Sequence, residues 1–209
     1  MDVTYLDNAA TTFPKPQAVK EAVARCLDGW IVDPGRGSHR VSTMSSEEIN
    51  TSREVLASHL GICVDRLSFV PSATFGINTV MQGYILPNNR ALYVSPYEHN
   101  AVARCAERLK ATRGIEYHKL PIHPINLVDL KQMESQFRKV PPGLVVVTHA
   151  CNVTGDLLPV KEIIEIAHRY DGKVLVDGAQ TVGLHTPRYS DYGYDFLAFS
   201  SHKGLFGIP

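Results

Sequence analysis

Polar side chains with distinct chemistry follow five predicted β-strands. They supply, in chain order, the hydroxyl of Thr74, the imidazole of His99, the amide of Asn152, the carboxylate of Asp177 and the amine of Lys203. A helix N-terminus with a hydroxyl suits a phosphate, and a carboxylate can keep an aromatic ring nitrogen protonated. A lysine can bond covalently to an aldehyde. Such a set would suit a cofactor that carries a phosphate, a protonated ring nitrogen, a phenolic oxygen and an aldehyde.

Each of these residues also has a simpler structural interpretation. Ser72 or Thr74 could cap the helix that follows, and Asp177 could cap the turn after its strand. His99 could be a hydrogen-bonded loop residue, Asn152 and Gln180 could be turn residues, and Lys203 could be a solvated surface cation. For single residues both interpretations stay open.

The elements that must position these side chains alternate between strands and helices. Helices are predicted over 18–26, 45–60, 74–85, 100–112, 127–139 and 160–170. Strands are predicted over 67–70, 91–95, 115–120, 144–148, 173–177 and 196–200. The alternation indicates an α/β domain with a largely parallel sheet, in which ligands bind beyond the C-terminal ends of the strands. We expect residues 1–45 to form an N-terminal arm and first helix, and residues 46–209 to form the main domain.

The composition excludes several classes of protein. Hydrophobic residues make up 44% and charged residues 20% of the 209 residues, and the 21 Lys and Arg balance the 21 Asp and Glu. This balance gives no reason to expect a nucleic-acid or anionic-membrane partner, and no apolar run approaches the ~20 residues of a membrane span. The N-terminus lacks the pattern of a secretory signal. The cysteines are widely spaced, without a CxxC pair, which argues against a zinc site or disulfide framework and predicts a cytoplasmic location.

Four stretches together resemble the class V aminotransferase superfamily, and most closely its cysteine desulfurase and selenocysteine lyase group. They are YLDNAATT at residues 5–12, EHNA at 98–101, VDGAQTVG at 176–183 and FSSHKG at 199–204. The resemblance covers essentially the whole chain. It implies pyridoxal 5′-phosphate bound to a fold-type I large domain, an α/β architecture with a largely parallel sheet and flanking helices. It also implies a homodimer.

The resemblance assigns the catalytic roles to three residues. Lys203 matches the lysine that holds the cofactor covalently, Asp177 the carboxylate paired with the pyridine nitrogen, and His99 the imidazole stacked on the ring. The remaining cofactor contacts implied by the family are the phosphate binders Ala73, Thr74, Ser200 and His202 and the amides Asn152 and Gln180 near the phenolic oxygen. Arg36 and His39, within GRGSHRVS at residues 35–42, are further candidates on the substrate side.

Some features depart from the family pattern. Ser72 stands where the group has glycine at the helix start, and Ser201 stands where it has glycine before the His-Lys pair. Family members are longer than this chain. By this resemblance the C-terminal small domain is absent, and with it the arginine that binds the substrate carboxylate and the loop cysteine that takes up sulfur. Cys151 lies nearest the predicted site, and we interpret it as a small loop or core residue.

The resemblance implies an enzyme that releases sulfur from cysteine, or selenium from selenocysteine, and leaves alanine. A cysteine thiolate would attack the substrate sulfur, Lys203 would shuttle protons, and a sulfur-acceptor protein would be a partner. One alternative is another class V enzyme: an aminotransferase, a kynureninase-like hydrolase or an epimerase. A second is a truncated fragment that binds the cofactor without turnover.

Overall fold

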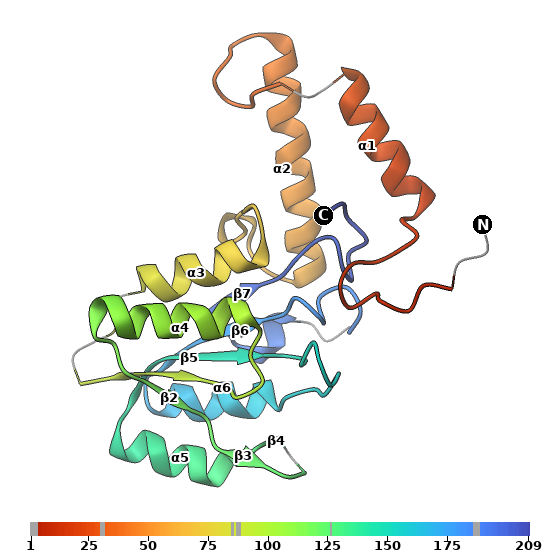
Figure 1. The fold of residues 1–209 in the computed structure, drawn as a ribbon. Helices are drawn as coiled ribbons and strands as arrows, with labels where there is room; N and C mark the ends of the chain where they lie inside the picture. The colour runs from red at the N-terminus through yellow and green to blue at the C-terminus, as the bar shows by residue number, and fades with distance from the viewer. Residues whose placement is uncertain (1–3, 30–31, 85, 87–88, 126, 186–188) are drawn as a thin grey trace.

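A central sheet organises the structure, a computed structural model that describes residues 4–29, 32–84, 86, 89–125, 127–185 and 189–209. The five strands of this sheet are all parallel and lie in the order β2-β1-β5-β6-β7 (Figure 1). Their bounds are β1 Ala91–Val94, β2 Tyr117–Lys119, β5 Pro142–Thr148, β6 Lys173–Asp177 and β7 Phe196–Ala198. Every residue of β5 is buried, as expected for a central strand covered on both faces.

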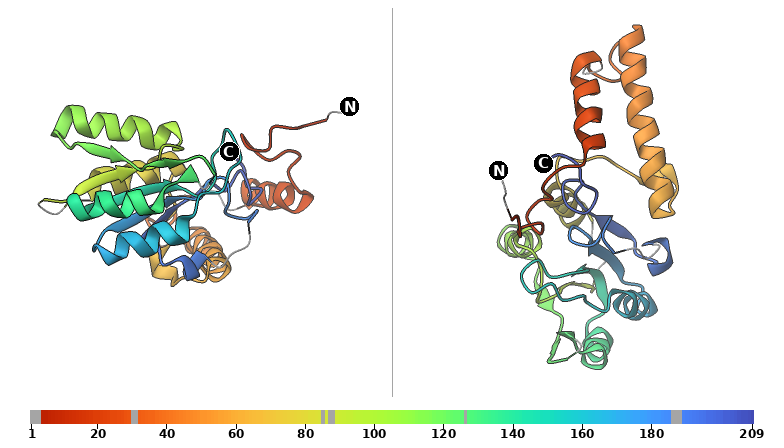
Figure 2. Two further views of the ribbon diagram at one scale, coloured as in Figure 1. Left: turned by 90° about the horizontal axis from the view of Figure 1, so that it is seen from below. Right: turned by 90° about the vertical axis from the view of Figure 1, so that its right-hand side faces the viewer.

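Helices cover both faces of the sheet (Figures 1 and 2). Alternate residues of β5 point to opposite sides, so Val145 and Val147 join one apolar cluster and Leu144 and Val146 join the other. The first cluster includes residues of α5 (Leu130–Lys139) and α6 (Val160–Arg169), and the second includes residues of α3 (Ala73–Gly83) and α4 (Asn100–Arg113). The predicted α/β/α architecture is confirmed.

Two helices project from the sheet domain, α1 (Gln17–Gly29) and α2 (Arg40–Leu60). α2 ends at Gly61, whose φ of 71° is left-handed, as the predicted cap requires. Leu60 at this end packs with Leu67, Val182 and Tyr189. The helix begins five residues earlier than predicted, so the domain boundary expected after residue 45 falls inside α2; the division of the chain remains a prediction.

Four short elements complete the described chain. The hairpin strands β3 (Ile122–His123) and β4 (Leu127–Val128) pair antiparallel outside the main sheet. The 3₁₀ helices are η1 (Val64–Arg66) and η2 (Tyr189–Tyr192).

Two predicted elements are wrong. Residues 67–70 are extended but form no strand in the described chain, and the side chains of Phe69 and Val70 are 50% and 42% exposed. Apolar, β-branched residues favour a strand, but a strand also needs a paired neighbour. The helix predicted over 127–139 begins only at Leu130, because Asp129 caps it and Leu127, with φ 63°, turns back to pair with His123.

Candidate active site

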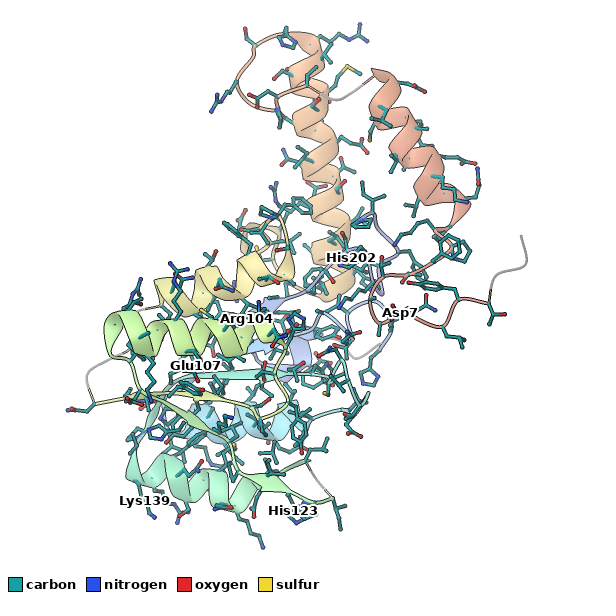
Figure 3. The ribbon with its side chains drawn as sticks, viewed as in Figure 1. Asp7, Arg104, Glu107, His123, Lys139 and His202 are labelled. Atoms are coloured by element: carbon teal, nitrogen blue, oxygen red, sulfur yellow. The ribbon has the colours of Figure 1, made fainter. Side chains whose placement is uncertain are left out.

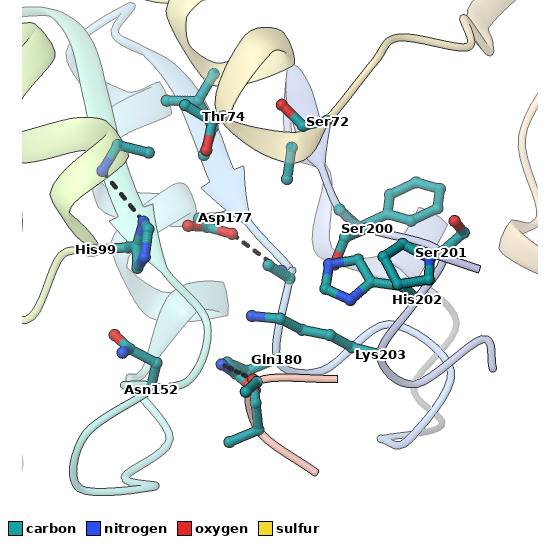
Figure 4. A pocket seen from close by; sticks show the side chains of 18 of the residues that line it. Ser72, Thr74, His99, Asn152, Asp177, Gln180, Ser200, Ser201, His202 and Lys203 are labelled. Atoms are coloured by element: carbon teal, nitrogen blue, oxygen red, sulfur yellow. Dashed lines mark hydrogen bonds between the residues drawn. The ribbon is translucent and has the colours of Figure 1, made fainter. Parts of the chain in front are cut away.

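A cavity of about 680 Å³ opens at the C-terminal ends of β5, β6 and β7, next to the start of α3 (Figure 4). It is lined by every residue that the sequence predicts to bind the cofactor: Ala73, Thr74, His99, Asn152, Asp177, Gln180, Ser200, His202 and Lys203. The structure therefore brings together residues that are separated by up to 130 positions in the chain. This placement agrees with the expectation that ligands bind beyond the strand ends of a parallel sheet.

Asp177 is the buried carboxylate of the cavity. It is the last residue of β6, its side chain is almost fully buried, and its Oδ1 accepts a hydrogen bond of 2.9 Å from the Ala179 N–H. Burial raises the pKa of Asp177, and the Ala179 N–H, His99 and Lys203 oppose that rise. Oδ1 of Asp177 thus caps the turn after its strand, which is the simpler structural interpretation. Its other oxygen, Oδ2, is available to a cationic partner.

Lys203 points its amine toward the middle of the cavity, among Asp177, Asn152 and Gln180 (Figure 4). Burial lowers the pKa of Lys203, and the attraction of Asp177 only partly opposes this effect. A lowered pKa leaves more of the amine neutral, and the neutral amine is the form that attacks an aldehyde. Lys203 is therefore a half-buried, reactive amine and not the surface cation that a lone lysine would suggest.

The start of α3 and the turn before Lys203 offer polar groups suited to an anion. Ser72 caps α3 by accepting from the Phe75 N–H, which leaves the N–H groups of Ala73 and Thr74 in a first turn that has no helical acceptor for them. The Ser200 hydroxyl and His202 Nδ1 are buried, and within the described chain neither has a hydrogen-bond partner. Because buried polar groups normally find partners, these two fit a phosphate between them and the helix start.

His99 and the two amides complete the cavity wall. His99 caps α4 by accepting at Nδ1 from the Ala101 N–H at 3.1 Å, so in the neutral ring Nε2 carries the proton. The Gln180 side chain donates to the Ala9 carbonyl at 3.1 Å, while Asn152 lies exposed on the loop after β5. His99 and Gln180 thus make structural hydrogen bonds, and both line the cavity together with Asn152.

The sequence interpretation missed several residues around the cavity. Asp7, Ala9 and Ala10 of the N-terminal segment line it, as do Thr148 and Ala150 at the end of β5. Asp7, Ala9 and Ala10 lie within the YLDNAATT stretch, so the family resemblance points to this segment without assigning a role to any single residue in it. Figure 3 shows Asp7 and His202 at the same end of the molecule, away from Lys139.

Arg36 and His39 are not among the residues that line the cavity. Arg36 pairs with Asp33 at 3.6 Å, and His39 caps α2 by accepting from the Ser42 N–H at 3.3 Å. Both belong to the loop at the end of α2 that lies remote from the sheet (Figure 1). The structure gives them no contact with the site.

Glu98, next to His99, is a further buried carboxyl group that sequence reasoning missed. Its Oε1 accepts from the Ser95 hydroxyl at 2.5 Å and from the Thr148 N–H at 2.6 Å, so it joins the ends of β1 and β5. Burial raises the pKa of Glu98 to about 8. The group is therefore largely protonated at neutral pH.

Cys151 is buried at the end of β5, as predicted for a core or loop residue. Burial raises the pKa of its thiol, but hydrogen bonds from Thr154 and Val153 outweigh this and the net shift is downward. The described residues contain no group of three metal-ligating side chains, and no helix among them is long and apolar enough to cross a membrane.

Comparisons with known proteins identify the family and the fold of the chain. The family model for aminotransferase class-V matches residues 4–209. A cysteine desulfurase of Shigella sonnei (strain Ss046) is 33% identical over 211 residues, covering 99% of this chain and 51% of the relative. The apo structure of a cysteine desulfurase from Thermococcus onnurineus NA1 is 29% identical with a TM-score of 0.90, covering 99% of this chain and 51% of that one.

The chain spans about half the length of the curated relatives it matches. The described fold is the large domain of the pyridoxal phosphate-dependent fold type I, and the match runs through the predicted motifs from the N-terminal segment to Lys203. The chain belongs to the class V aminotransferase family, whose members depend on pyridoxal phosphate.

Proposed function

We propose that this protein is a pyridoxal phosphate-dependent cysteine desulfurase, which releases sulfur from cysteine, or selenium from selenocysteine, and leaves alanine. The observation that carries the proposal is the direction of the Lys203 amine, which points into the cavity toward the buried Asp177. The names of the relatives favour this member of the family over an aminotransferase, a kynureninase-like hydrolase or an epimerase.

The residues of the cavity fit the parts of the cofactor one by one. Asp177 would accept a hydrogen bond from the protonated ring nitrogen, and the exposed face of His99 would lie on the ring. The phosphate would take the N–H groups of Ala73 and Thr74 together with the partnerless Ser200 hydroxyl and His202 Nδ1. The amides of Asn152 and Gln180 would serve the phenolic oxygen, and Lys203 would hold the aldehyde carbon.

When bound, the cofactor supplies an electron sink for the bonds of the substrate α-carbon. Lys203, with its lowered pKa, is suited to carry protons to and from that carbon near neutral pH. The charge of Asp177 would keep the ring nitrogen protonated, and the N–H on His99 Nε2 would move a proton at the substrate sulfur. Burial of Asp177 excludes water from this pair and strengthens their attraction.

Three wider properties belong to the same proposal. A sulfur-acceptor protein would receive the released sulfur, and a second copy of the chain would form a homodimer. The protein would work in a reducing, cytoplasmic environment, which is supported by the free state of all four of its cysteines.

The cofactor assignment is tested by adding pyridoxal phosphate to the purified chain. We expect a yellow protein, and reduction with borohydride should leave the cofactor on the peptide that contains Lys203. Lys203→Ala should abolish both signals, whereas Lys139→Ala, on the exposed end of α5, should leave them unchanged. A colourless wild-type protein would refute cofactor binding by this chain.

The reaction is tested by product analysis with cysteine as substrate. With dithiothreitol present to reduce the released sulfur, sulfide and alanine in equal amounts support the desulfurase, and a keto acid would instead identify an aminotransferase. A yellow chain that gives neither product would support the alternative of a cofactor-binding chain without turnover.

A further inference from the structure

The N-terminal arm, residues 4–16, lies against the turn that carries Lys203. The Thr12 hydroxyl donates to the Lys203 carbonyl at 2.7 Å, and the Thr12 N–H donates to the His202 carbonyl at 3.1 Å. Thr12 and Lys203 are 191 positions apart in the sequence. One residue of the arm is thus hydrogen-bonded to two successive peptide groups at the lysine.

Two neighbours of Thr12 reinforce this contact. The Thr11 hydroxyl donates to the His202 carbonyl at 3.0 Å, and the Lys15 amine donates to the same carbonyl at 2.9 Å. The His202 carbonyl therefore accepts from three groups of the arm, one of them charged, and charge-assisted hydrogen bonds are the stronger kind. The turn at Lys203 lies outside every named helix and strand. Its backbone is therefore held by these hydrogen bonds from the arm and not by those of a helix or sheet.

The arm is also attached on the other side of the cavity. The Gln180 amide donates to the Ala9 carbonyl at 3.1 Å, so the segment between Ala9 and Thr12 joins the loop after β6 to the lysine turn. Tyr5 stiffens this segment. Its hydroxyl lies 2.9 Å from the carbonyl oxygens of both Asp7 and Thr11, which compete for its single proton, and its ring packs edge-on against Phe13. The arm is therefore hydrogen-bonded to two walls of the cavity, the loop after β6 and the turn at Lys203.

We propose that Thr12 is a positioning residue for Lys203, and that its two hydrogen bonds to the lysine turn hold the amine toward Asp177. The backbone of Lys203 sets where its four-carbon side chain starts, so a displaced turn would move the amine relative to Asp177. The inference deepens the proposed function, since it concerns the residue that would bond to the cofactor.

The position of the amine determines a measurable property. The pKa of Lys203 is lowered because the side chain is buried. If the hydroxyl of Thr12 is lost and the turn loosens, the amine gains water and its pKa returns toward the ordinary value of a lysine. Titration of Lys203 in the cofactor-free chain therefore reports whether the arm holds it in place.

The experiment measures the pH dependence of trace acetylation of Lys203 by mass spectrometry, without pyridoxal phosphate. Thr12→Val keeps the shape and the backbone N–H but removes the hydroxyl, and we expect the midpoint for Lys203 to move upward. Thr12→Ser restores a hydroxyl and should return the midpoint to the wild-type value. Lys139 in the same digest is the internal reference and should not move.

An unchanged Lys203 midpoint in Thr12→Val would overturn the proposal. If that variant does not fold by circular dichroism, Thr11→Val removes a second hydroxyl donor of the arm and is judged by the same criterion. Because the readout needs no cofactor, it is independent of the proposed function. That function fails if the wild-type chain stays colourless with pyridoxal phosphate or forms no alanine from cysteine. With the cofactor added, Thr12→Val should become yellow several-fold more slowly than wild type, and Thr12→Ser should recover the rate.

Discussion

Strands β5 and β6 are buried along nearly their whole length, whereas α1 has no buried residue at all. The sheet is held by apolar side chains on both of its faces, each fully buried aliphatic or aromatic group contributing about 1.5–3 kcal/mol. The N-terminal arm is instead joined to the rest of the molecule by directed hydrogen bonds to the Lys203 turn and the Gln180 loop.

The site lies where these two regions meet. Asp177 is the last residue of β6, which pairs with β5 and β7, so the sheet fixes its backbone, and the Ala179 N–H binds one oxygen of its side chain. Lys203 lies in a turn beyond an edge strand, and its backbone is held by the arm. The carboxylate therefore depends on apolar packing and the amine on polar contacts, and mutations in the two regions should have different effects.

The largest effect should come from the core of the sheet domain. Phe137 is fully buried in α5 and packs edge-on against Tyr93 at 4.7 Å between ring centroids. Phe137→Ala leaves a cavity and should lower the free energy of unfolding by about 3–5 kcal/mol in denaturant titrations. Leu27→Ala in α1, where the side chain is 67% exposed, is the control and should change it by less than about 0.5 kcal/mol. If both variants lost the same free energy of unfolding, the buried sheet domain and the exposed helix α1 would not differ in their contribution to stability.

A smaller effect is expected at the turn after the lysine. A Cβ on Gly204 would collide with the Val182 carbonyl and lie 2.9 Å from the Leu184 side chain, so the turn must shift. Gly204→Ala should cost about 1–3 kcal/mol and also weaken colour formation with pyridoxal phosphate. The control is Gly83→Ala at the end of α3, where nothing lies within 4 Å of the added methyl group. That variant should be neutral, or stabilising by less than about 1 kcal/mol. Full cofactor binding by Gly204→Ala would show that the turn tolerates displacement.

A different kind of effect, a change in the pH dependence of stability, is expected at Glu98, which joins two strands of the sheet. Burial raises the pKa of Glu98 to about 8, so the folded chain binds this proton more tightly than the unfolded chain does. The stabilisation is complete below the ordinary carboxyl pKa and is lost as the pH rises through about 8. Glu98→Gln cannot ionise, and its unfolding free energy should fall less than that of wild type over this range. Parallel profiles of the two proteins would contradict the raised pKa.

The sequence was most informative where a pattern is local. The run LVVVT predicts a buried strand, and β5 is buried at every position. Gly61 predicted the end of α2, and the structure confirms it. The error at residues 67–70 arose because apolar residues predict an extended backbone but cannot show whether a neighbouring strand pairs with it. The late start of α5 followed from the left-handed turn at Leu127, which the helical periodicity of the segment concealed.

By itself, the sequence determined the α/β class, the edge of the sheet that carries the site, and nine of the residues that line the cavity. Period-2 and period-3.6 patterns decide which side chains are buried, and parallel connections bring all the strand ends to one edge. Only the tertiary structure decided that Arg36 and His39 lie away from the site, that Glu98 links β1 to β5, and that the arm holds the Lys203 turn. Hydrogen bonds between residues as distant as Thr12 and Lys203 leave no periodic trace in the chain, because they depend on how completed elements pack together.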